Sequence, residues 1–196
     1  MEQFLEPAPF VESEAPAIRA WVSDRLADCD EIESAQRVFH FVRDDVSHSW
    51  DIQGRRVTRT AVDVLTYREG ICYAKSHLAA ALLRCAGVPA GICYQRLTLM
   101  DDDAAGYAVH ALNTVYLRSL ERWIRFDARG NKPGVDAQFS LDREQLAFRI
   151  RPQYDEIDYL LNYAQPHSAI VKTLVENDDA IAMYASGLPS ALDGGA

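Results

Sequence analysis

The feature that most limits how this chain can fold is a helix-like run that begins at Cys72. Its apolar positions recur at helical spacing, at Ala74, Leu78, Leu82 and Cys85. Gly87 and Pro89 end the run, because glycine favours the end of a helix and proline cannot continue one. Strand-like alternation follows, most clearly over residues 107–117. We therefore expect this helix to pack against a sheet that comes later in the sequence.

The rest of the chain adds helices on both sides of these strands. Helical patterns cover residues 14–28, 31–46, 60–65, 156–164, 166–176 and 179–186, and strand patterns cover residues 90–100, 106–118 and 121–128. We expect an extended lead-in over residues 1–12 and a flexible C-terminal tail over residues 187–196. The elements predict a single α+β domain over residues 1–186, in which N-terminal helices pack on an antiparallel β-sheet.

The charge of the chain argues against two classes of partner. The formal net charge is −9, and no basic stripe suited to nucleic acid or to an anionic membrane surface is present. The first residues lack the basic and apolar regions of a secretory signal, and no apolar run is long enough to cross a bilayer. We therefore expect a cytoplasmic protein that binds neither nucleic acid nor membrane. The sequence leaves its oligomeric state open.

The cysteines favour a reduced protein without a metal site. Cys29, Cys72, Cys85 and Cys93 form no C-x-x-C pair, and cytoplasmic cysteines stay reduced. The three aspartates at 101–103 match no calcium loop and are expected to form a solvated turn. We expect no metal and no cofactor, and Cys29, Cys85 and Cys93 are interpreted as small apolar residues.

Cys72 differs from the other three because it begins a helix. The unpaired N–H groups and the positive dipole end of a helix N-terminus both favour the thiolate, which is the nucleophilic form. One expected strand contains His110 and the next contains Asp127. A nucleophilic cysteine, a histidine base and an aspartate that orients the histidine are the groups required for acyl transfer through a thioester.

A simple hairpin would bring His110 and Asp127 together. If Ser119 and Leu120 form a two-residue loop, Leu112 lies opposite Asp127, and His110 becomes the diagonal neighbour of Asp127. Diagonal neighbours are roughly 7–8 Å apart at the backbone, within reach of an imidazole and a carboxylate. The prediction depends on the length of this loop.

The same region resembles the transglutaminase-like superfamily, with its cysteine protease-like, papain-like core. The resemblance covers about residues 30–130 and rests on three segments, Gly70-Ile-Cys-Tyr-Ala-Lys-Ser-His-Leu, Val109-His-Ala-Leu-Asn and Trp123-Ile-Arg-Phe-Asp. It implies that Cys72 is the nucleophile, His110 the base and Asp127 the orienting acid. Two positions depart from the family pattern: Leu112 stands where a tryptophan is common, and Asp127 is followed by Ala-Arg-Gly-Asn. The substrate class therefore does not carry over. We also do not expect calcium activation, because the chain lacks the extra domains of the calcium-dependent crosslinking enzymes of the family.

Several neighbouring residues receive less prominent interpretations. His48 or Trp50 is a candidate second donor to an oxyanion, although a loop that packs against the second helix is favoured for both. His77 is expected to be satisfied or exposed, and Lys75 to be solvated. A third set, Arg129, Asn131 and Lys132, is a candidate lining of a substrate cleft.

The sequence therefore predicts a thiol enzyme that hydrolyses an amide or peptide bond in a peptide, a protein or a small amide. Three alternatives stay open: transfer of the acyl group to an amine, an acetyltransferase-like acyl carrier that uses coenzyme A, and a non-catalytic binding module of the same fold.

Overall fold

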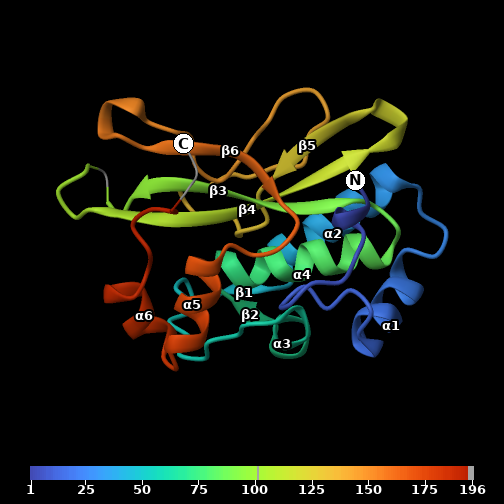
Figure 1. Cartoon of the computed structure of the whole chain (residues 1–196), viewed down its shortest axis with the longest axis horizontal. Coiled ribbons are helices and arrows are strands. Elements are labelled where there is room, and N and C mark those ends of the chain that lie inside the picture. The colour runs from blue at the N-terminus through green and yellow to red at the C-terminus, as the bar shows by residue number, and fades with distance from the viewer. Residues whose placement is uncertain (101, 194–196) are drawn as a thin grey trace.

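The computed structural model describes residues 1–100 and 102–193 (Figure 1). The helices are α1 (Pro16–Arg25), α2 (Glu31–Asp44), α3 (Ala61–Tyr67), α4 (Cys72–Cys85), α5 (Ser168–Glu176) and α6 (Ala180–Ser186), with short 3-10 turns η1 (Glu2–Phe4), η2 (Arg118–Leu120) and η3 (Pro152–Tyr154). The strands are β1 (Ser47–His48), β2 (Glu69–Gly70), β3 (Ala90–Thr98), β4 (Tyr107–Leu117), β5 (Arg122–Phe126) and β6 (Ile157–Tyr163). The predicted α+β class is confirmed.

The larger sheet has four antiparallel strands in the order β5-β4-β3-β6. β1 and β2 form a separate parallel pair. Figure 1 shows the helices gathered below the sheet, with α4 directly under it. The fold therefore has two layers, one of helices and one of sheet.

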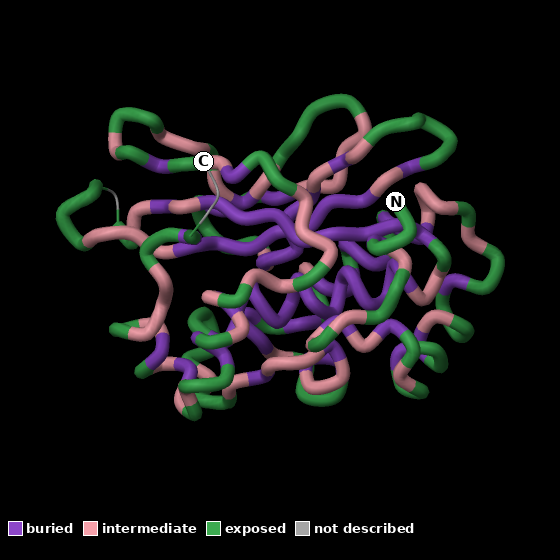
Figure 2. Tube along the Cα trace, viewed as in Figure 1, coloured by how far each residue is buried: buried purple, intermediate pink, exposed green. Residues whose placement is uncertain are grey.

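Helix α4 forms the centre of the core. Every residue from Cys72 to Arg84 is buried, because α4 contacts α1, α2 and α3 as well as β3 and β4. Figure 2 shows the buried residues concentrated in α4 and the sheet, with exposed residues in the surrounding loops. The apolar spacing read from the sequence therefore describes only part of the buried surface of α4, since its polar residues are buried too.

One predicted element is wrong. Residues 156–164 were expected to form a helix, but β6 is a strand that pairs with β3 at the edge of the sheet. Ile157, Tyr159, Leu161 and Tyr163 alternate along this segment, and Leu160, which interrupts the alternation, is exposed. That period matches a strand, and the free edge of β3 supplies the hydrogen bonds that the strand needs.

The other expected helices and strands agree with the structure to within a few residues, but the lead-in expected to be extended over residues 1–12 begins with the 3-10 turn η1. Thr60 caps α3 as expected: its side chain accepts from the N–H of Asp63, and the Asp63 carboxylate accepts from the N–H of Thr60. Residues 102–106 form the turn between β3 and β4, while Asp101 lies outside the described residues.

The flexible tail expected over residues 187–196 stays a prediction, and residues 194–196 lie outside the described part of the chain. Two contacts hold the described part of this tail, up to residue 193, against the sheet. Leu192 is buried and its N–H donates to the hydroxyl of Tyr159, and the Pro189 carbonyl accepts from the N–H of Val109.

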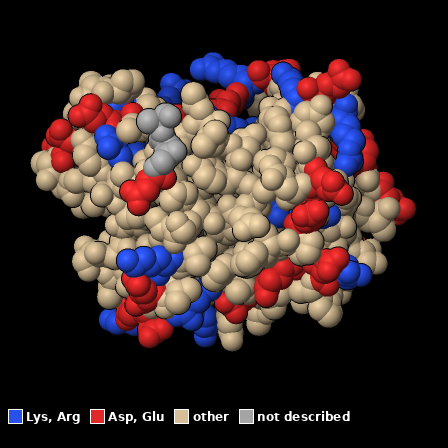
Figure 3. Space-filling model, in the orientation of Figure 1, with Lys and Arg blue, Asp and Glu red and all other residues tan. Residues whose placement is uncertain are grey.

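On the face drawn in Figure 3, acidic and basic side chains both lie towards the edges, and uncharged residues occupy the middle. Within the described residues, no helix is both long and apolar enough to cross a membrane.

Candidate active site

Cys72 is the first residue of α4, and the chain enters the helix through β2. Gly70 fits there because an added Cβ would lie only 2.9 Å from Oγ1 of Thr58. The Cys72 side chain is buried, with the residue 6% exposed. The N–H groups of the first helical turn have no partner within the helix, so they and the helix dipole favour negative charge at this position.

The β4–β5 hairpin has the register expected from the sequence. Leu117 lies opposite Arg122 and Asn113 lies opposite Phe126. Continuing this register places residue 112 opposite residue 127, as predicted. The connection contains the 3-10 turn η2 and a left-handed Glu121, so its shape differs from a plain two-residue loop while the pairing is the same.

His110 and Asp127 form a buried hydrogen bond, with 2.7 Å between Nε2 and Oδ2. Asp127 is fully buried and also accepts from two backbone N–H groups, those of Arg129 at 3.0 Å and Ala147 at 3.2 Å. These N–H groups fix the carboxylate in place. Because Nε2 is engaged by Asp127, Nδ1 of His110 remains for a second partner.

The charges of the site favour an imidazolium. Burial alone would lower the pKa of His110, but the charges of Asp127 and Cys72 outweigh it and raise the pKa to about 10. Burial alone would raise the pKa of Asp127, yet the charge and hydrogen bond of His110 lower it. The directions of the pKa shifts of His110 and Asp127 both fit an ion pair between them.

Cys72 and His110 line the same small cavity, which has a volume of about 90 Å³. Its other lining residues come from several segments: Ile71, Tyr73, Leu97, Ala108, Val109, Phe148, Tyr184 and Leu188. The Phe148 ring lies edge-on to His110, with 5.1 Å between ring centroids. Pockets for whole small-molecule ligands usually measure roughly 300–1,000 Å³. This cavity is therefore too small for a whole small-molecule ligand.

Lys75 is buried, and the expectation that it is solvated is wrong. Its Nζ donates to the carbonyls of Val46 at 2.5 Å and Arg129 at 2.8 Å. Burial and the nearby Arg129 charge lower the pKa of Lys75 to about 7. The lysine holds the segment before β1 against the segment that follows Asp127.

The two candidate upstream donors both contact Tyr184 of α6. Trp50 stacks on the Tyr184 ring at 4.8 Å, and Nε2 of the buried His48 lies 3.4 Å from the Tyr184 hydroxyl. Burial, followed by the charge of Arg129, holds the pKa of His48 well below its ordinary value. The sequence favoured packing of this loop against the second helix, whereas the contacts of both residues shown here are with Tyr184 of α6, which lines the cavity.

The three candidate cleft residues after Asp127 have other partners. Arg129 forms a two-pronged ion pair with Asp51, at 2.5 and 2.9 Å, and Lys132 joins the same carboxylate at 2.9 Å. The Asn131 side chain bonds the backbone of Ala137. None of the three lines the small cavity at Cys72.

Sequence reasoning missed the residues that enclose the site. Phe148, Tyr184 and the N–H of Ala147 come from segments that follow Asp127 by about 20 to 60 residues. No motif marks them in the sequence. Only the path of the chain after β5 brings them back to Cys72.

Comparison with known proteins assigns the chain to a family. The model of the transglutaminase-like superfamily matches residues 18–128, which is more than half of the chain. The chain belongs to this superfamily. The matched region ends just after Asp127 and contains Cys72, His110 and Asp127.

A solved structure adds a distant likeness. A proposed cysteine protease from Cytophaga hutchinsonii matches with a TM-score of 0.47 and 22% sequence identity, over 64% of this chain and 40% of that one. The chain thus spans about two fifths of the length of that protein. A search of the curated proteins gave no match.

Proposed function

We propose that the protein is a thiol hydrolase that cleaves an amide or peptide bond through a thioester on Cys72. The observation that carries this proposal is the arrangement of three groups. Cys72 begins a helix and lines one cavity with His110, and Nε2 of His110 lies 2.7 Å from the fixed carboxylate of Asp127. This is the arrangement of nucleophile, base and orienting group that thioester chemistry needs.

The proposed reaction has two steps. The Cys72 thiolate attacks the carbonyl carbon, the C–N bond breaks, and the His110 imidazolium gives its proton to the leaving amine. Water then gives a proton to His110 and attacks the thioester, which releases the acid and the Cys72 thiolate. The N–H of Cys72 itself is suited to stabilise the oxyanion in both steps.

Asp127 supports this chemistry by holding the ring of His110. Its own two backbone hydrogen bonds keep the carboxylate from turning away. A fixed carboxylate favours the imidazolium and keeps Nδ1 directed to the thiol. We assign no metal and no cofactor a part in either step.

Hydrolysis and transfer differ only in what attacks the thioester. Transfer needs a site that holds an amine and excludes water. We favour hydrolysis because no residue pattern indicates a dedicated amine site. A fluorogenic peptide-amide library will supply a substrate, and the products are then measured with increasing concentrations of a primary amine.

We expect the free acid to dominate and the Cys72→Ala variant to be inactive, while Cys85→Ala serves as the control and keeps full activity. A conjugate that dominates at low amine concentration would make the protein a transferase. Iodoacetamide that labels Cys72 no faster than Cys93, whose pKa burial raises to about 12, would argue for a non-catalytic module.

A further inference from the structure

A second, much larger cavity lies next to the one at Cys72. It has a volume of about 1,300 Å³, and two of its lining residues, Leu97 and Phe148, also line the small cavity. The segment from Gly134 to Arg151 supplies most of its other walls. The two cavities therefore share a boundary at Leu97 and Phe148.

The register of the sheet places the larger cavity on the face that carries His110. Gln95 of β3 lies directly opposite His110 on one side and opposite Asp158 of β6 on the other. Residues directly opposite each other in antiparallel strands project to the same face. Gln95 and Asp158 both line the larger cavity, so His110 stands at the end of the row of side chains that forms its floor.

The floor contains an unsatisfied polar group. Gln95 is only 1% exposed, and its Oε1 has no hydrogen-bond partner among the described residues. A buried carboxamide oxygen without a partner costs free energy, so such atoms are normally paired in the working state. A carboxamide carries both donors and an acceptor, which complements the amide of a peptide.

The walls contain arginines that differ in their partners. Arg125 bonds the carboxylates of Glu144 and Asp158, and Arg151 bonds Glu156. Within the described part of the chain, no carboxylate pairs with the guanidinium of Arg149 or with that of Arg143. Two cationic side chains of the cavity are therefore free to meet an anion.

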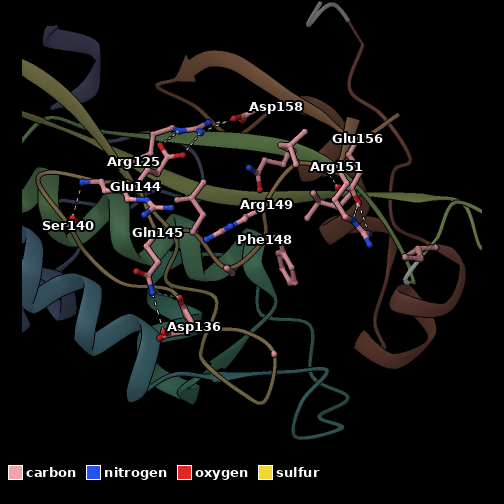
Figure 4. A pocket seen from close by; sticks show the side chains of 18 of the residues that line it. Arg125, Asp136, Ser140, Glu144, Gln145, Phe148, Arg149, Arg151, Glu156 and Asp158 are labelled. Carbon is pink, nitrogen blue, oxygen red and sulfur yellow. Dashed lines mark hydrogen bonds and ion pairs between the residues drawn. The ribbon is translucent and has the colours of Figure 1, made fainter. Parts of the chain in front are cut away.

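Arg149 is the better placed of the two. It directly follows Phe148, which lines both cavities. In Figure 4 it lies between the Arg125–Glu144–Asp158 network and the Arg151–Glu156 pair. Asp136 is the one acidic residue lining the larger cavity that has no cationic partner among the described residues. Its carboxylate already accepts hydrogen bonds from Gln138 and Gln145.

We propose that the larger cavity binds a peptide-like part of the substrate that carries a carboxylate, with Arg149 as its counter-ion and Gln95 bonded to its amide. This inference rests on the proposed function, because the same molecule must reach Cys72. The volume suits a ligand of a few amino-acid residues. The substrate class is therefore an acidic peptide or an amide of an acidic amino acid.

Thiol-reactive probes test the proposal without a known substrate. The α-carboxamides of iodoacetyl-glutamate and iodoacetyl-glutamine differ by one carboxylate but hardly in shape, and a glycine spacer gives a longer pair. The Cys72 sulfur forms a bond to the acetyl carbon and iodide leaves. The rate of labelling at Cys72 is measured by mass spectrometry over a range of probe concentrations.

We expect at least one glutamate probe to label Cys72 about fivefold more efficiently than its glutamine partner, which is the effect of one exposed ion pair. The preference should fall at high salt, disappear in Arg149→Gln and reverse in Arg149→Glu. Arg143→Gln is the matched control, since it removes a cavity arginine that is further from Phe148 in the chain, and it should keep the preference.

The outcomes separate the two proposals. If Cys72 reacts with every probe no faster than Cys93, the proposed function fails. If Cys72 reacts rapidly but glutamate and glutamine probes are equal at both spacings, the thiol site stands and the carboxylate site is overturned. A preference that survives in Arg149→Gln but is lost in Arg143→Gln would also overturn the assignment of Arg149.

Discussion

Two buried histidines lie in very different surroundings. His110 on β4 is 6% exposed and bonds the Asp127 carboxylate, whereas His77 on α4 is 0% exposed and bonds only the carbonyl of Arg59, at 2.8 Å. The other ring nitrogen of His77, Nε2, has no partner among the described residues. The first region surrounds its histidine with charge and the second surrounds it with neutral groups.

The difference shows that burial alone does not make a histidine suited to catalysis. Burial lowers the pKa of both rings, and at His77 it prevails, giving a pKa of about 4. At His110 the fixed Asp127 carboxylate and Cys72 reverse the effect and raise the pKa to about 10. A neutral, immobile His77 is a packing residue, and a charged His110 next to a thiol is a candidate acid and base.

The largest expected effect separates the two histidines by activity. His110→Ala should lower kcat/KM roughly 10⁵-fold or more, because the thiol loses its base. His77→Ala should lower stability and leave kcat/KM of the folded protein within about threefold. Kinetics with a substrate from the peptide-amide screen, with the folded fraction measured by circular dichroism, provide the comparison. Equal losses of activity would remove the distinction.

Replacing the carboxylate tests why the two rings differ. Asp127→Asn should keep the fold and lower kcat about 10⁴-fold, since the ring loses its preferred tautomer and its counter-charge. The measurement is kcat across pH 5–9, together with the pKa of His110 by NMR. A His110 pKa that stays near 10 in this variant would show that Asp127 is not the cause of the shift.

His77 also predicts a loss of stability in acid. Its folded pKa of about 4 lies below the unfolded value near 6.5, so protons bind the unfolded state first. The stability that the neutral His77 ring contributes to the folded protein is fully present above about pH 6.5 and is lost as the pH falls towards 4. The loss is on the order of 3 kcal/mol in total. His48, whose pKa is also lowered, acts in the same direction.

Urea unfolding at pH 7 and at pH 4.5 measures this loss in the unmodified protein and in His77→Gln. The variant should lose less stability between the two pH values. His110 acts in the opposite direction, since its raised pKa gives stability that is present below about pH 6.5 and lost as the pH rises towards 10. An identical pH dependence in both proteins would contradict the lowered pKa of His77.

The smallest expected effect concerns the cap beside the His77 region. Thr60 follows Arg59, whose carbonyl bonds His77, and caps α3. Thr60→Ala should lower the free energy of unfolding by about 1 kcal/mol through loss of the capping bond. The kcat of Thr60→Ala should be unchanged. Thr60→Ser should keep the free energy of unfolding of the unmodified protein. A change in kcat would mean that the His77 region does affect the reaction.

Local signals were sufficient to predict much of the site. The helix that begins at Cys72 follows from its apolar spacing and from Gly87 and Pro89. The pairing of β4 with β5 follows from a short connection, which leaves few registers that a hairpin can adopt. The hydrogen bond between His110 and Asp127 is a consequence of that register. Each of these features depends on residues close together in the chain.

Other features depended on contacts between distant segments. Residues 156–164 have mixed local preferences, and they became a strand because β3 offered a free edge. Lys75 is an ordinary lysine in the sequence, and it is buried because two carbonyls from different loops meet its Nζ. Local pattern cannot report such partners.

The sequence by itself determined the candidate reacting groups, since helix start, hairpin register and chain order place Cys72, His110 and Asp127. Only the tertiary structure decided what surrounds them. Phe148 and Tyr184 close the small cavity, and Gln95 and Arg149 face the large one. The physical reason is that the shape and charge of a cavity come from side chains of several segments packed together, and no one segment encodes them.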